Sequence, residues 1–121
     1  MFTAKKGILE PHGYEVITLA GAGQEVKILP VNGFNLYEWT VDGNEILMKP
    51  DDITAFGAKY GTPILFPTPN RIKDCVYSWN GVKRTQQKRG VPVQRHGLVM
   101  DEPFKVKRLE WGDDCALCGG K

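Results

Sequence analysis

Residues 34–48 read FNLYEWTVDGNEILM, and this stretch indicates the fold most directly. Two β-rich runs, residues 34–41 and 45–48, flank the pair Asp42-Gly43. An Asp-Gly pair suits a type I′ turn, because both central residues of that turn have a positive φ. The stretch therefore predicts a β-hairpin.

A second hairpin is predicted further along, where residues 76–79 and 82–84 flank Asn80-Gly81. Strand patterns also occur at residues 14–19, 25–30 and 104–111. No window repeats its apolar residues at helical spacing without a Gly or Pro interrupting it. The chain is therefore expected to be all-β and antiparallel.

The segments between these strands are less regular. Residues 50–60 form a polar connector that has room for a helical turn. Residues 61–69 contain three prolines, which predicts an edge or a buried irregular segment, since proline cannot donate to a strand ladder. Residues 83–94 are polar and basic and are interpreted as a long loop. Residues 113–121 follow the last expected strand without a further element, so the chain is expected to be the front part of a larger domain.

The overall composition fits one soluble domain of 121 residues, with a net charge of +2. This charge is too mild to indicate nucleic acid or a membrane surface as a partner. No stretch is long and apolar enough to span a bilayer, and no signal-peptide core follows Met1. Three cysteines, an odd number, argue against a disulfide framework, so a cytoplasmic location is expected.

Two short phrases carry the candidate chemistry. Residues 61–72 read GTPILFPTPNRI and end on Asn70 and Arg71, and residues 95–99 read RHGLV and contain His96. The predicted hairpin between them folds the chain back and brings Arg71 and His96 together. An amide, a guanidinium and an imidazole on one wall suit a polyhydroxylated ligand.

The order of these phrases resembles the N-terminal part of the aldose 1-epimerases (galactose mutarotases). The resemblance covers roughly residues 28–104 and includes the downstream phrase DEPF at residues 101–104. It implies an antiparallel β-sandwich of the galactose mutarotase supersandwich type, of which residues 1–121 would be an incomplete N-terminal portion. It also implies a cleft in which the α and β anomers of a free hexose are interconverted.

Carried over by position, the resemblance makes Asn70 and Arg71 the sugar-binding pair and His96 an active-site histidine that holds the sugar near its ring oxygen. The family's proton-donating second histidine, a sugar-binding aspartate and the glutamate base lie further downstream, outside these residues. The chain would thus carry one wall of the site and lack the general acid and base. No cofactor or metal is implied.

The residue chemistry fits these roles. Mutarotation requires a base for the C1 hydroxyl and an acid for the ring oxygen, and an imidazole titrates near neutral pH. The guanidinium of Arg71 cannot transfer protons, but it can grip two sugar oxygens at once. Phe66 or Trp79 could supply an apolar platform for a sugar, although core packing is the expected role of any single aromatic residue here.

Other interpretations remain open. His96 could be a structural histidine in a turn, and Arg71 an ordinary surface cation. The Cys115–Cys118 spacing resembles half of a zinc knuckle, but the matching second pair of ligands is missing. The basic residues of the predicted loop are expected to be a solvated face rather than a nucleic-acid patch: Lys83, Arg84, Lys88, Arg89 and Arg95.

The main alternative function is a non-catalytic carbohydrate-binding module on the same fold, which would grip the sugar without the acid and base. The sequence leaves open which aldose or sugar phosphate is preferred, and which oligomeric state forms.

Overall fold

The computed structural model describes residues 1–48, 51–52 and 60–121. Within these residues the chain consists of short strands and one 3-10 turn, with no α-helix. The elements are β1 (Thr3–Leu9), β2 (Tyr14–Gly21), β3 (Gln24–Leu29), β4 (Asn35–Val41), β5 (Asn44–Glu45), η2 (Lys73–Cys75), β6 (Val76–Trp79), β7 (Val82–Thr85), β8 (Gln87–Lys88), β9 (Val91–Pro92), β10 (Val106–Trp111) and β11 (Ala116–Gly120). The predicted all-β class is confirmed. The expected connector at residues 50–60 falls largely outside the described residues.

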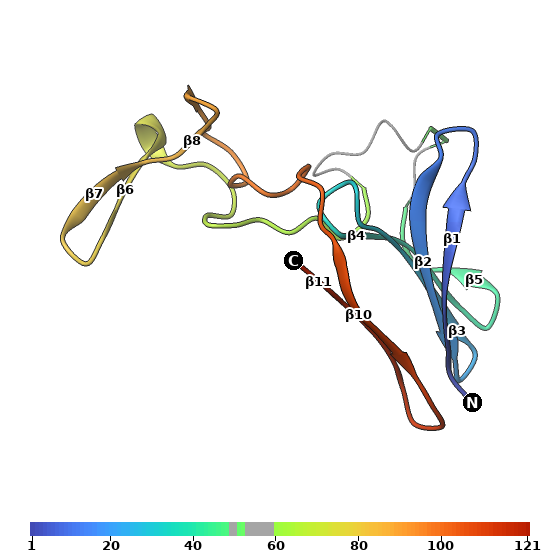
Figure 1. Ribbon diagram of the computed structural model, residues 1–121. Coiled ribbons are helices and arrows are strands. Elements are labelled where there is room, and N and C mark those ends of the chain that lie inside the picture. The colour runs from blue at the N-terminus through green and yellow to red at the C-terminus, as the bar shows by residue number, and fades with distance from the viewer. Residues whose placement is uncertain (49–50, 53–59) are drawn as a thin grey trace.

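The largest unit is a five-stranded antiparallel sheet in the order β1-β2-β3-β4-β5, so each strand pairs with its neighbour in the chain. Figure 1 shows it as the blue to green meander. The predicted Asp42-Gly43 turn has positive φ at both residues, 49° and 80°. That conformation is the one a type I′ turn requires.

Two strands differ from the sequence expectation. β1 was not foreseen, because its Lys5-Lys6-Gly7 run has low β propensity, yet it pairs with β2 over its full length. The strand expected at residues 45–48 is reduced to the two-residue β5, which forms only two pairs with β4.

The core of the sheet is small. Ile17 and Leu29 are 0% and 1% exposed, and Val16, Leu29 and Tyr37 form one buried cluster. These side chains come from three adjacent strands, β2, β3 and β4, so the middle of the sheet carries the main hydrophobic contact.

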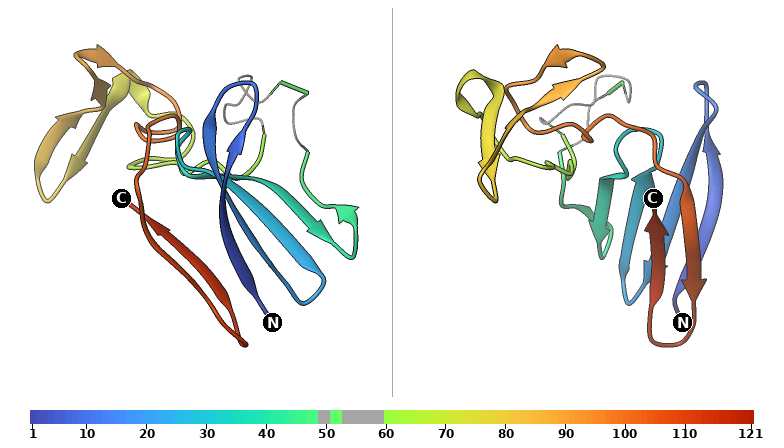
Figure 2. Two further views of the ribbon diagram at one scale, coloured as in Figure 1. Left: turned by 45° about the vertical axis from the view of Figure 1, so that its right-hand side comes forward. Right: turned by 60° about the vertical axis from the view of Figure 1, so that its left-hand side comes forward.

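The hairpin β10–β11 forms a second, separate sheet that lies alongside β1 and β2 (Figure 2). The N–H of Phe2 donates to the carbonyl of Gly112 at 2.9 Å and ties the hairpin to the first strand. Residues 116–120 thus form a strand where the sequence predicted no further element. Two antiparallel sheets in contact agree with the predicted sandwich class.

Residues 73–93 form an arm that extends away from the five-stranded sheet (Figure 1). The arm contains the two-stranded sheets β6–β7 and β8–β9. The Asn80-Gly81 turn of the first hairpin has positive φ at both residues, as predicted. The prediction of a long loop at residues 83–94 was wrong, because β8, β9 and the end of β7 lie within it, whereas the strand predicted at residues 82–84 is confirmed as part of β7. Lysine, arginine and glutamine dominate this run, so the sequence shows no apolar alternation there.

The proline-rich residues 61–69 are irregular, as expected, and make only isolated bridges at Thr62 and Phe66. They are less buried than the sequence indicated. Ile64 and Phe66 are 40% and 63% exposed. The segment therefore runs over the surface between the sheet and the arm.

Candidate functional site

The two phrases that carry the candidate site lie side by side. Arg71 and Arg95 form an isolated antiparallel bridge. On either side of it, the N–H of His96 donates to the carbonyl of Asn70 at 2.8 Å, and the N–H of Ile72 donates to the carbonyl of Gln94 at 3.0 Å. This short ladder holds the backbones of Asn70, Arg71 and His96 together, although 25 positions separate Arg71 from His96 in the sequence.

A second contact fixes the residues just after His96. Phe66 and Gly97 form a parallel bridge, and the N–H of Leu98 donates to the carbonyl of Phe66 at 2.7 Å. A Cβ atom on Gly97 would lie only 2.1 Å from that carbonyl oxygen. The close approach requires glycine at this position, next to the candidate histidine.

Asn70 and His96 both have left-handed backbone conformations, with φ of 55° and 62°. Seven further non-glycine residues of the described chain have a positive φ, most of them in turns, so this conformation is not confined to the candidate site. Asparagine tolerates the conformation well. The two strained residues are joined to each other by the His96–Asn70 hydrogen bond.

The three candidate side chains differ in exposure. Asn70 and Arg71 are exposed, whereas His96 is partly buried. The Nδ1 atom of His96 is fully buried and has no hydrogen-bond partner among the described residues. A buried polar atom without a partner is rare and calls for an explanation, of which a functional role is one.

Gln86 was missed by the sequence analysis. Its side chain is 1% exposed. Its Oε1 accepts from the hydroxyl of Thr68 at 2.8 Å, and its Nε2 donates to the carbonyl of Val93 at 3.0 Å. Nothing in the sequence distinguishes Gln86 from its exposed neighbour Gln87, because both lie in the same polar run.

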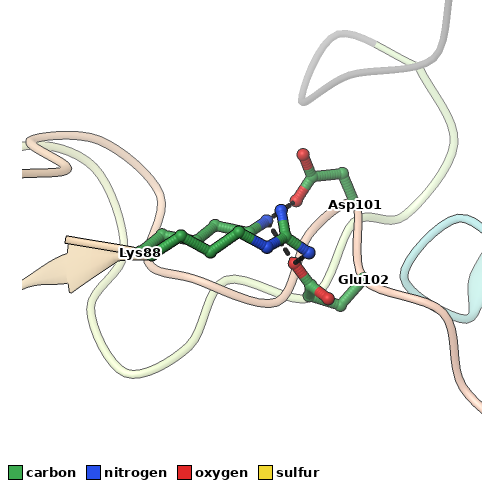
Figure 3. A network of polar contacts seen from close by, with 4 residues as sticks. Lys88, Asp101 and Glu102 are labelled. Atoms are coloured by element: carbon green, nitrogen blue, oxygen red, sulfur yellow. Dashed lines mark hydrogen bonds and ion pairs between the residues drawn. The ribbon is translucent and has the colours of Figure 1, made fainter. Parts of the chain in front are cut away.

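An ion cluster joins the arm to the residues that follow His96 (Figure 3). The ammonium of Lys88 lies 2.5 Å from a carboxylate oxygen of Asp101 and 2.6 Å from one of Glu102. The hydrogen bonds within the cluster raise the pKa of Lys88, and the bond from Lys88 lowers the pKa of Asp101. Arg89 adds a longer contact to Glu102 at 3.5 Å. Two of the expected solvated cations are therefore paired.

With this geometry in place, the comparisons with known proteins decide the family. The model of the aldose 1-epimerase family matches residues 15–117. The chain belongs to the aldose 1-epimerase family. The match extends beyond residues 28–104, over which the resemblance was seen in the sequence.

This chain is similar in structure to a galactose mutarotase-like protein from Clostridium acetobutylicum, which was solved by crystallography. The two are 26% identical, with a TM-score of 0.80 over 97% of this chain. The chain spans 37% of the length of that protein. The search of curated proteins found no match.

Two aromatic residues of this epimerase-family chain, Phe66 and Trp79, do not pack in the core, whereas Tyr37 does. Phe66 and Trp79 are 63% and 69% exposed. Trp79 lies beside the turn of the β6–β7 hairpin, whereas Phe66 contacts Gly97 through its backbone. Of the two, Phe66 is the one that adjoins the candidate site.

The cysteines give no sign of a metal centre in the described part of the chain. Cys75, Cys115 and Cys118 are free thiols, and burial raises the pKa of Cys118. No group of three or more potential ligands gathers among the described residues. The described residues also contain no helix long and apolar enough to cross a membrane.

One cavity lies away from the candidate site. It has a volume of about 230 Å³ and opens between the sheet and the turn of the β10–β11 hairpin. Its lining includes Phe2, Leu19, Val26 and Ala116 and none of the candidate site residues. A mainly apolar lining does not suit a sugar, so the geometry of residues 70–71 and 95–97 is the better guide to function.

Proposed function

We propose that Asn70, Arg71 and His96 form one wall of a hexose site in an aldose 1-epimerase that interconverts α and β anomers. The observation that carries this proposal is the ladder between residues 70–72 and 94–96. It holds together the backbones of two segments that carry an amide, a guanidinium and an imidazole, in a chain that belongs to this family.

The proposed roles follow from the side chains. The fixed fork of Arg71 donates to two sugar oxygens and orients the ring, with charge-assisted hydrogen bonds that are stronger than neutral ones. Asn70 offers a donor and an acceptor to the neighbouring hydroxyls. His96 holds the sugar near the ring oxygen, where a proton must arrive when the ring opens.

We propose that the general acid and base lie outside these 121 residues, so that the chain forms the N-terminal part of a single mutarotase-like domain. The chain has two histidines, and His12 lies beside Tyr14 and Asp52, at the β1–β2 turn. His96 is thus the one histidine available to the ladder. Free thiols fit a reducing, cytoplasmic setting, and the family fits a role in carbohydrate metabolism.

The same observation favours a second candidate. A site with Asn70, Arg71 and a single histidine can bind a sugar without catalysing mutarotation, as a carbohydrate-binding module would. Binding and turnover must therefore be measured separately.

Binding is tested by titrating the ¹⁵N-labelled chain with D-galactose and D-glucose and following the amide resonances by NMR. We expect shifts at Arg71 and His96, and at least about tenfold weaker binding in Arg71→Met, because a charge-assisted pair is lost. Arg84→Met, which removes an exposed arginine of β7, is the matched control. Equal affinity in both variants would contradict the proposed site.

Turnover is tested by following the optical rotation of freshly dissolved α-D-glucose. The chain alone is expected to change the rate little relative to buffer. Turnover typical of a complete mutarotase would show that the acid and base lie within these residues. Binding without turnover, persisting in every longer form of the protein, would favour the binding module.

A further inference from the structure

Gln86 stands out on the arm because it is buried where its neighbours are not. It is 1% exposed, whereas Thr85 and Gln87 are exposed. A buried amide is costly unless its donor and acceptor are both satisfied. The hydrogen bonds of the Gln86 side chain are therefore needed to keep it buried.

Those contacts reach both segments of the candidate site. The side chain accepts from the hydroxyl of Thr68, two positions before Asn70, and donates to the carbonyl of Val93, three positions before His96. The backbone adds to this, because the N–H of Val93 donates to the carbonyl of Gln86 at 2.9 Å. Gln86 thus spans the two segments at the point where they enter the ladder.

The ladder itself is short. One bridge and two flanking hydrogen bonds hold residues 70–72 to residues 94–96, and the arm between them extends into solvent. A two-stranded ribbon of this length is marginally stable by itself. The buried amide of Gln86 fixes the distance between the hydroxyl of Thr68 and the carbonyl of Val93, just outside the ladder.

We propose that Gln86 is a positioning residue that sets the separation of Asn70 and Arg71 from His96. This inference rests on the proposed function, because the separation matters for a sugar only if those residues bind it. Its side-chain hydrogen bonds go to Thr68 and Val93 and not to the candidate side chains, so Gln86 acts through those two residues.

The decisive variant is Gln86→Met, which keeps the length of the side chain and removes both hydrogen bonds. Gln87→Met makes the same change at the exposed neighbour and is the matched control. Two quantities are measured on the full chain: hydrogen exchange at the amides of Ile72 and His96, and affinity for D-galactose by NMR titration.

In Gln86→Met we expect about tenfold or faster exchange at both ladder amides, because unsatisfied partners are left at a buried position. Galactose affinity is expected to fall about tenfold, while exchange at Ile17 in the centre of the sheet stays unchanged. Gln87→Met is expected to match the wild type. Ladder exchange and affinity that are equal in the two variants would overturn the proposal.

Two milder variants keep the test valid if Gln86→Met unfolds the chain. Thr68→Val removes the hydroxyl donor alone, and Gln86→Glu keeps an acceptor for Thr68 but loses the donor to Val93. Each is expected to speed hydrogen exchange at the His96 amide, by less than Gln86→Met does. A double variant of Thr68→Val with Gln86→Met is expected to be non-additive, since the two residues share one bond. No change in either milder variant would overturn the proposal.

The two hypotheses fail in different ways. If the wild-type chain shows no galactose-dependent shift at Arg71 or His96, the sugar site is wrong, and the exchange data still report whether Gln86 holds the ladder. If galactose binds at those residues and is insensitive to Gln86→Met, the site stands and the positioning role is wrong.

Discussion

One residue next to the candidate histidine, Gly97, has a strict steric requirement. Gly97 is buried, has φ of 73°, and approaches the backbone of Phe66 too closely for any side chain. Gly90, on the arm, has a similar φ of 79° but open space where a Cβ would lie. Alanine substitutions at Gly97 and Gly90 therefore distinguish the destabilisation caused by a close contact from that caused by a left-handed backbone conformation.

We expect Gly97→Ala to destabilise the chain by about 3 kcal/mol, since backbone strain and a clash with Phe66 add. Gly90→Ala is expected to cost only about 1 kcal/mol, because conformational strain acts alone there. Urea unfolding of both variants measures the difference. If both variants lose the same free energy of unfolding, the backbone at Phe66 moves aside without an energetic penalty.

At the scale of elements, the ion cluster connects β8 to residues 101–102. Those residues are in turn tied to the loop before β4, because the N–H of Gly33 donates to the carbonyl of Glu102 at 2.7 Å. Lys88 is 22% exposed in its side chain and Asp101 is 65% exposed. Ion pairs this open contribute about 0.2–1 kcal/mol, so the cluster serves as a link between elements more than as a source of stability.

The cluster predicts a defined pH dependence. The pKa of Asp101 is lowered, so its contribution is present above its unfolded pKa and is lost as the pH falls through its folded pKa. The pKa of Lys88 is raised, so its contribution is complete below its unfolded pKa and is lost as the pH rises through its folded pKa. The link is therefore complete at neutral pH and weakens in strong acid and strong base.

We expect Lys88→Met to raise the pKa of Asp101 toward its ordinary value, as read from the carboxyl ¹³C shift during an acid titration. The exposed Lys83 of β7 provides the control, and Lys83→Met is expected to leave that pKa unchanged. An Asp101 pKa that is insensitive to Lys88→Met would mean that the ion pair does not form in solution.

At the scale of the whole molecule, the chain is open. Its accessible surface is 8110 Å². A compact monomer of 13.5 kDa is expected to expose about 6,500 Å². The arm, which extends away from the five-stranded sheet, and the separate β10–β11 sheet, which lies alongside β1 and β2, account for this shape (Figures 1 and 2).

The shape predicts the result of small-angle X-ray scattering. A compact domain of 121 residues has a radius of gyration of about 14 Å. We expect a clearly larger value for this chain at concentrations where it is monomeric, because the arm extends away from the sheet. A value of about 14 Å would show that the arm folds back onto the sheet in solution.

Local sequence determined the parts of the fold that depend on neighbouring residues. The Asp42-Gly43 and Asn80-Gly81 turns, the strands around them and the absence of helical periodicity all follow from backbone preferences. The family was also predicted from the sequence, through the order of the phrases at residues 61–72 and 95–104. By contrast, β1 was not predicted, because residues 5–7 have low β propensity. This strand is stabilised by its pairing with β2 rather than by the β propensity of its own residues.

Only the tertiary structure decided which polar residues of the arm are buried or paired. Gln86 and Gln87 are the same residue type in the same run, yet only Gln86 meets Thr68 and Val93. Lys88 likewise finds Asp101 only after the chain has turned back. Such contacts join residues 7 to 18 positions apart. Their partners depend on how the arm packs against the residues before and after it in the chain, and no local sequence pattern specifies that packing.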